Sequence, residues 1–255
     1  MVQGKVAAII PARMGSSRYP GKPLVPILGL PMIEHVRRRV LKMKGIDLVI
    51  VATCDQEIAD VVRAAGGVAV MTSDQHERAT ERIEEAARSI DADIIINVQG
   101  DEPMVLEEPL ADLIRAFSSP DVKCACIAYP IVDQSELHSD NIVKTVLSRS
   151  GKMIYFSRAA IPGRKPQATT KYFKQSGIMA FRKETLHQFT KLQMTPLEIQ
   201  ESVDLMRLLE NDISVQAVIS KLETRGVDIP AQVAEVEAAI MGDPEQRRIF
   251  ESLSS

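Results

Sequence analysis

Three cationic side chains fall within one short segment near the start of the chain. Arg13, Arg18 and Lys22 belong to the sequence PARMGSSRYPGKPL (residues 11–24). Long cationic arms and exposed backbone amides in one loop can hold a polyanion such as a phosphate chain. The residues predicted to bind a nucleotide in this way are Pro11, Ala12, Arg13, Gly15, Ser16, Ser17, Arg18 and Lys22.

The same segment excludes two common nucleotide-binding classes. It contains neither GxxxxGK[ST] nor GxGxxG, so a P-loop NTPase or a dinucleotide enzyme fits poorly. A solvated polar loop with incidental charges is the alternative. The phosphate interpretation is favoured because the loop directly follows an apolar run that is typical of a strand.

Two acidic residues are candidates for a metal site. Asp101 follows the run IIINV in the sequence NVQGDEP, and Asp228 lies late in the chain before Pro230. Mg²⁺ usually takes one or two carboxylates together with oxygens of its substrate. For Asp101 the alternative is a turn residue that binds local backbone. For Asp228 the alternative is a helix N-cap, which the residues alone favour.

Apolar runs that alternate with amphipathic segments predict the elements that position these residues. Near-continuous Val and Ile runs indicate parallel strands that helices cover on both faces. Ligands of such sheets bind outside the carboxyl ends of the strands. The expected strands are residues 6–10, 47–52, 68–71 and 94–98, and the expected helices are 32–43, 57–65 (ended by Gly66-Gly67) and 80–90.

The second half of the chain has a more mixed pattern. Its expected strands are 124–131, 142–147, 177–181 and 215–219, and its expected helices are 196–211 and 229–241. The polar, basic stretch 162–171 is predicted to be a mobile loop.

Composition bounds the class of protein. The chain has 255 residues, 45% of them apolar, and a formal net charge of −3. It can bury a large core, and a strongly basic nucleic-acid binder is not expected. The run VAAII at residues 6–10 is far shorter than the roughly 20 residues of a membrane span and lacks a secretory cleavage pattern. Three cysteines without a CxxC motif suit a reducing, cytoplasmic environment.

Four motifs together resemble one enzyme family. The loop PARMGSSRYPGKPL looks like the signature of sugar nucleotidyltransferases of the cytidylyltransferase type, and NVQGDEP, YFSRAAIP (residues 155–162) and GVDIP (residues 226–230) are similar to the 3-deoxy-manno-octulosonate (Kdo) cytidylyltransferases. The resemblance implies a single α/β domain of the Rossmann-like nucleotide-diphospho-sugar transferase type, with a mixed, mostly parallel central sheet flanked by helices. It also implies a homodimer, with a dimerisation and acceptor subregion around residues 125–210.

The resemblance further implies a reaction. CTP and a 2-keto sugar acid would give the CMP-sugar and pyrophosphate, with Mg²⁺ and without a His, Ser or Cys nucleophile. Arg13 and Lys22 match the family's triphosphate-binding cations, and Asp101 and Asp228 match its metal-binding acids. Gln99 and Arg158 fall at positions near the sugar acid. No nucleic-acid or membrane partner is implied.

Two regions depart from the family pattern. The family's SGTxR segment after a His becomes Arg78, Ala79, Thr80, Glu81 and Arg82, and these positions lie near the nucleotide; Arg78, Ala79, Thr80 and Arg82 are therefore predicted to bind it. At the acceptor positions Gln175 replaces a His, Met179 and Phe181 replace tyrosines, and Asp204 replaces a Glu. Polar groups carry acceptor specificity, so another keto-sugar acid, a nonulosonate-type sugar or a phosphonocarboxylate stays open as acceptor. A non-catalytic nucleotide-binding regulatory module is the remaining alternative, and the presence of both metal carboxylates speaks against it.

Overall fold

The computed structural model describes residues 4–16, 18–163 and 171–253, and the chain divides into two compact units. The first unit comprises Gly4–Glu107 and Thr224–Ser255, and the second comprises Glu108–Glu223. The expected acceptor subregion 125–210 falls within the second unit. The expectation of a single domain stays a prediction.

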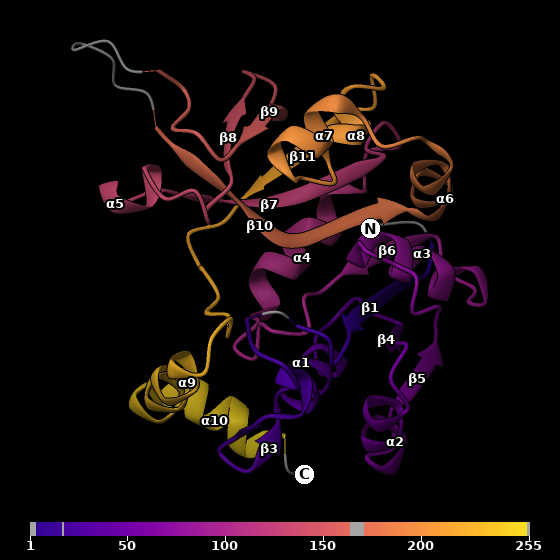
Figure 1. The fold of residues 1–255 in the computed structure, drawn as a ribbon, viewed down its shortest axis with the longest axis vertical. Coiled ribbons are helices and arrows are strands. Elements are labelled where there is room, and N and C mark those ends of the chain that lie inside the picture. The colour runs from indigo at the N-terminus through magenta and orange to yellow at the C-terminus, as the bar shows by residue number, and fades with distance from the viewer. Residues whose placement is uncertain (1–3, 17, 164–170, 254–255) are drawn as a thin grey trace. The chain divides into compact units, whose positions relative to one another are not determined.

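The first unit is built on a parallel sheet (Figure 1). Its strands follow the order β5 (Val68–Met71), β4 (Leu48–Thr53), β1 (Val6–Ala12) and β6 (Ile94–Asn97), and all three pairings are parallel. The Ile side chains of β1 and β6 are completely buried and Val6 is 3% exposed, as the apolar runs predict. All four strands expected in this half of the sequence are confirmed.

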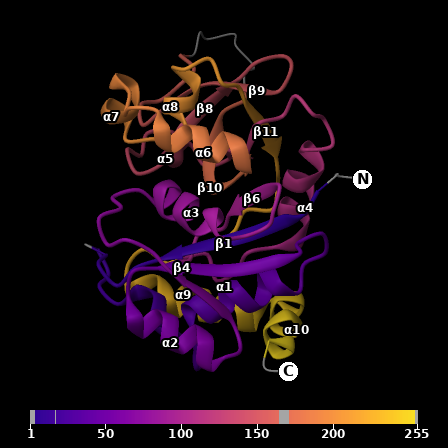
Figure 2. The ribbon, with the colours of Figure 1, turned by 90° about the vertical axis from the view of Figure 1, so that its right-hand side faces the viewer.

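Helices cover both faces of this sheet. Figure 2 shows α1 (Met32–Leu41) and α2 (Gln56–Ala64) on one face and α3 (Ala79–Arg88) on the other. Gly66 follows α2 with a left-handed φ of 73°, which confirms it as the residue that ends this helix. The short helix η1 (Lys22–Leu24), the hairpin of β2 (Pro26–Ile27) and β3 (Leu30–Pro31), and the helices α9 (Ala231–Gly242) and α10 (Pro244–Ser252) complete the unit.

The second unit contains a mixed sheet. The strand order is β10 (Phe173–Arg182), β7 (Cys124–Pro130), β11 (Val215–Ile219), β9 (Lys152–Ser157) and β8 (Lys144–Leu147). Among the described residues of this unit, β11 pairs with β7 in parallel, and the other pairings are antiparallel. The four expected strands are present, and β9 is an additional one. The helices are α4 (Glu107–Ala116), α5 (Gln134–Leu137), α6 (Lys183–Lys191), α7 (Pro196–Glu201) and α8 (Met206–Leu209).

The single helix expected at residues 196–211 is wrong. Helix α7 ends at Ser202, whose φ of 53° is left-handed, and α8 begins only at Met206. The break lets Arg207 donate two hydrogen bonds to the buried Glu198 carboxylate, at 2.7 and 2.6 Å. In one continuous helix these residues would lie about 13 Å apart along the axis. Burial of a paired charge therefore overrides the apolar periodicity.

The structure also bears on the expectations for the cysteines, for the loop at 162–171 and for a membrane span. Cys124 and Cys126 are fully buried and unpaired, which confirms them as core residues, and Cys54 is half-buried. Most of the predicted loop at 162–171 lies outside the described residues. Within the described parts of the chain, no helix is both long and apolar enough to cross a membrane.

A neutral histidine supports the first unit. His35 on α1 is completely buried, its Nε2–H donates to the Ile27 carbonyl at 2.7 Å, and its ring stacks on Phe250. Burial lowers the pKa of His35 to about 4, and the nearby charges of Arg39 and Arg38 act in the same direction. The ring is therefore neutral when the protein is folded at neutral pH.

We expect His35 to make folding stability depend on pH. Its pKa falls from 6.5 when unfolded to about 4 when folded. Between these values only the unfolded state binds the proton, so the stabilisation is complete above pH 6.5 and is lost as the pH falls. The loss amounts to about 3 kcal/mol. Denaturant unfolding of wild type and His35→Gln at pH 7 and pH 4.5 should show a wild-type advantage that shrinks at low pH; a constant difference would contradict this.

Candidate active site

The loop after β1 is anchored to the neighbouring strand. The backbone N–H of Met14 donates to Asp55 Oδ2 at 2.8 Å, just beyond the end of β4. The Met14 carbonyl then accepts the N–H of Ser16 and the N–H of Gly21, at 2.9 and 3.0 Å. Gly21 has a φ of 73°, which favours glycine. These bonds close the loop and start η1 at Lys22.

Close packing at the end of β6 places Asp101 beside this loop. A Cβ on Gly100 would lie 2.8 Å from the Pro11 carbonyl oxygen, so only glycine lets the chain pass here. The Asp101 carbonyl accepts the N–H of Val227 at 2.9 Å, and Thr224 Oγ1 donates to Glu102 Oε2 at 2.5 Å. These two bonds fasten the late segment 224–228 to the end of β6.

Lys22 joins the two acidic residues. Its Nζ lies 2.6 Å from Asp101 Oδ2 and 3.4 Å from Asp228 Oδ1. The lysine side chain is only 12% exposed, against 32% for Asp101 and 47% for Asp228. Arg18 Nη2 adds a second cation 3.1 Å from the same oxygen of Asp228. Acids from distant parts of the sequence thus meet at one ammonium group.

This geometry decides the alternative for Asp228. The N-cap of α9 is Pro230, so the N-cap interpretation is wrong. The Asp228 carboxylate instead binds Lys22 and Arg18, while its backbone N–H donates to Gln232 Oε1 at 2.6 Å. The Asp101 carboxylate likewise accepts from Lys22.

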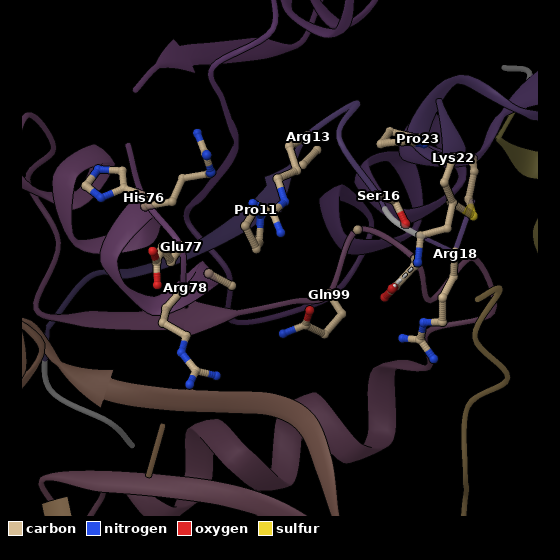
Figure 3. A pocket seen from close by; sticks show the side chains of 16 residues that line it. Pro11, Arg13, Ser16, Arg18, Lys22, Pro23, His76, Glu77, Arg78 and Gln99 are labelled. Carbon is tan, nitrogen blue, oxygen red and sulfur yellow. Dashed lines mark hydrogen bonds and ion pairs between the residues drawn. The ribbon is translucent and has the colours of Figure 1, made fainter. Parts of the chain in front are cut away.

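A cleft of about 320 Å³ opens over the carboxyl ends of the strands in the first unit. Figure 3 shows Ser16, Arg18 and Lys22 on one side of it and His76, Glu77 and Arg78 on the other. Of the predicted site residues, those that line it are Pro11, Ala12, Arg13, Ser16, Arg18, Lys22, Arg78, Ala79, Arg82, Gln99 and Asp101.

The other residues predicted to bind the nucleotide do not line the cleft or lie outside the described residues. Gly15 is in the loop but does not line the cleft, Thr80 is buried, and Ser17 lies outside the described residues. Five lining residues were not predicted: Pro23, Met32, His76, Glu77 and Gly100. His76 and Glu77 adjoin Arg78, and Gly100 lies in the QGD motif, so proximity in sequence could have found them; Met32 gives no such signal.

One buried and one partly buried polar contact hold the far side of the cleft. Arg82, 3% exposed, donates to Thr72 Oγ1 at 2.5 Å, and His76 Nε2 lies 2.5 Å from Glu85 Oε2. Partial burial would raise the pKa of Glu85, but the hydrogen bonds from Ser73 N–H and His76 lower it overall. Ala79 is the first residue of α3, where a glycine is not needed. The departure from the family pattern at this position therefore fits an ordinary helical backbone.

The predicted acceptor residues fall in different places. Gln99 lines the cleft of the first unit, whereas Gln175 and Asp204 line a second cavity, of about 390 Å³, in the second unit. Arg158 does not line that cavity. Its backbone N–H donates to Glu201 Oε2 at 2.9 Å, and its guanidinium donates to the carbonyls of Glu201 and Asp140. Their joint role as an acceptor site stays a prediction.

The donor set suits a magnesium ion completed by a substrate. Among the residues that the structure describes, no group of three or more His, Cys, Asp or Glu side chains could hold a metal. Asp101 and Asp228 nevertheless converge closely enough to contact one cation, Lys22. One or two carboxylates plus substrate oxygens are the usual ligands of Mg²⁺, so the residues fit.

Comparison with known proteins gives one consistent family. A family model described as cytidylyltransferase matches residues 7–218. The 3-deoxy-manno-octulosonate cytidylyltransferase of Geobacter metallireducens is 38% identical, over 91% of this chain and 96% of the relative, and that of Escherichia coli is 37% identical, over 92% and 95%.

Solved structures agree with these relatives. A CMP:2-keto-3-deoxy-manno-octonic acid synthetase, solved in complex with CTP, superposes with a TM-score of 0.89 at 37% identity, over 93% of this chain and 99% of that one. The 4-diphosphocytidyl-2C-methyl-D-erythritol synthase of Anaerococcus prevotii, with a TM-score of 0.64 at 14% identity, shares the fold. The expected α/β fold is therefore confirmed, and the chain belongs to the cytidylyltransferase family that includes the 3-deoxy-manno-octulosonate cytidylyltransferases.

Proposed function

We propose that the chain transfers the cytidylyl group of CTP to the anomeric hydroxyl of a Kdo-like 2-keto sugar acid, with release of pyrophosphate. The observation that carries the proposal is the meeting of Asp101 and Asp228 at Lys22, beside the cation-rich loop that lines the cleft. The relatives named for this reaction, and the solved relative that holds CTP, support the same assignment.

The loop after β1 supplies the charge that a triphosphate needs. Arg13 and Arg18 are exposed at the cleft, and Lys22 lies beside them. In such a transfer the acceptor oxygen attacks the α-phosphorus in line while the bond to the β-phosphate breaks. Positioning and charge neutralisation supply most of the rate, so these cations would stabilise the departing pyrophosphate. The base would then extend toward the segment of Arg78, Ala79 and Arg82.

Mg²⁺ is part of the proposal. Asp101 and Asp228 would hold it, because their carboxylates are the acidic groups that converge at the phosphate end of the cleft. When bound, Mg²⁺ withdraws charge from phosphate oxygens and lowers the pKa of a hydroxyl that it contacts. The two acids would also keep the ion beside the cation-rich loop.

The proposal also includes contacts to the acceptor. Gln99 offers an amide at the cleft, and Gln175 and Asp204 offer polar groups in the second cavity. The bonds that fix the Arg158 guanidinium run to carbonyl oxygens, so they leave its positive charge available for an acceptor carboxylate. By family resemblance we also propose a homodimer that works in the cytoplasm.

We expect pyrophosphate release to depend on both substrates. A screen of CTP, UTP, ATP and GTP against Kdo, a nonulosonate-type sugar acid and a phosphonocarboxylate should give the fastest Mg²⁺-dependent release with CTP and Kdo. Faster pyrophosphate release with another acid would change the proposed acceptor and leave the proposed reaction unchanged. CTP binding without release for any pair would identify a regulatory nucleotide-binding module.

We expect Asp101→Asn to lower kcat by at least about 100-fold, because a neutral amide is a poor ligand for Mg²⁺ and a poor partner for Lys22. Circular dichroism and thermal unfolding should be close to wild type, since the side chain is one-third exposed. Asp91→Asn is a matched control, because Asp91 is 89% exposed and pairs with Lys5 away from the cleft. Wild-type turnover in Asp101→Asn would remove Asp101 from the mechanism.

A further inference from the structure

Lys22 has two proposed roles, and its ammonium group would need a different position for each. It belongs to the cations that would bind the triphosphate, yet in this structure its ammonium contacts both carboxylates of the proposed metal site. The contact is close, with Nζ 2.6 Å from Asp101 Oδ2, and the lysine side chain is largely shielded from water. A residue of the chain itself therefore already compensates part of the charge of the two acids.

A divalent cation and this ammonium would compete for the same carboxylates. Mg²⁺ binds oxygen at about 2.0–2.1 Å. A lysine nitrogen that hydrogen-bonds both acids would then lie within a few ångströms of the metal, and like charges at such separations repel strongly. Mg²⁺ would therefore bind Asp101 and Asp228 less tightly while the lysine contacts both acids.

The chain is built so that Lys22 can move. Its backbone is fixed by Gly21 and by the first turn of η1, where the Lys22 carbonyl accepts the N–H of Val25 at 3.2 Å. The side chain has four rotatable bonds and carries a compact charge without a fixed direction. Arg18 approaches only Asp228, so Lys22 is the described cation that contacts both acids.

We propose that Lys22 is an internal counter-cation of the nucleotide-free enzyme. It compensates part of the charge of Asp101 and Asp228, weakens the binding of free metal there, and leaves when an incoming triphosphate offers its ammonium a new anion. Metal and nucleotide then bind with positive coupling, and by linkage each strengthens the other equally. The metal site itself rests on the proposed function, whereas the competition follows from the contacts of Lys22.

The test is metal affinity without nucleotide. Mn²⁺, which electron paramagnetic resonance detects when free, is titrated into wild type and Lys22→Met. We expect the variant to bind Mn²⁺ about tenfold more tightly, because a charge-assisted hydrogen bond no longer competes. Mg²⁺ should accordingly raise the melting temperature of Lys22→Met more than that of wild type. Lys22→Gln serves as the second variant if Lys22→Met does not fold.

Arg13→Met is the matched control. The substitution removes one positive charge from the same loop, but Arg13 contacts neither acid among the described residues. The Mn²⁺ affinity of Arg13→Met should therefore stay within about twofold of wild type. In the double variant Lys22→Met/Asp101→Asn the gain should disappear. A gain that is equal in Arg13→Met, or that survives Asp101→Asn, overturns the proposal.

The two proposals can fail separately. Equal Mn²⁺ affinity in wild type and Lys22→Met, while wild type still transfers the cytidylyl group, would refute the counter-cation and leave the function intact. Tighter binding by Lys22→Met, without transfer by wild type for any acceptor, would support the counter-cation and refute the function.

Discussion

The candidate site depends on compensating two carboxylates that the fold brings together. Asp101 and Asp228 would repel each other if nothing positive lay between them, and Lys22 and Arg18 supply that charge. Backbone bonds impose the arrangement, since the Asp101 carbonyl accepts the N–H of Val227. Backbone bonds of the chain therefore bring the acids together, and Lys22 and Arg18 provide the cations.

The parallel sheet explains why this convergence occurs where it does. The strands β1, β4 and β6 run in the same direction, so the segments that follow them meet at one edge. Each segment contributes a different constraint: Asp55 anchors the loop at Met14, and Gly100 permits close contact with Pro11. Backbone geometry thus forms the cleft, and the cationic side chains extend from that backbone.

The sequence predicted well what local pattern controls. Runs of Val and Ile predicted the strands. The spacing of the cations in residues 11–24 predicted that Arg13 and Lys22 lie together in one loop, which lines one side of the cleft. It predicted poorly what distant contacts control. The helix at 196–211 breaks because Arg207 pairs with the buried Glu198, and a periodicity argument does not contain that contact. Asp228 resembled an N-cap because its partner Lys22 is remote in the chain.

The departures from the family pattern lie in two different kinds of local structure: the start of a regular helix and an irregular part of a strand. Ala79 begins a regular helix, so its backbone needs no glycine and the frame of the nucleotide cleft is kept. Gln175 and Met179 lie instead on β10, on either side of an irregularity in its pairing with β7. Irregular strand segments re-aim side chains without rebuilding the sheet, and Gln175 and Met179 both line the second cavity. On the proposed function, changes at this cavity would alter which polyol groups of the acceptor find hydrogen-bond partners, and they would leave the loop and the acids of the first unit unchanged. The proposed reaction type and the proposed acceptor can therefore be tested separately.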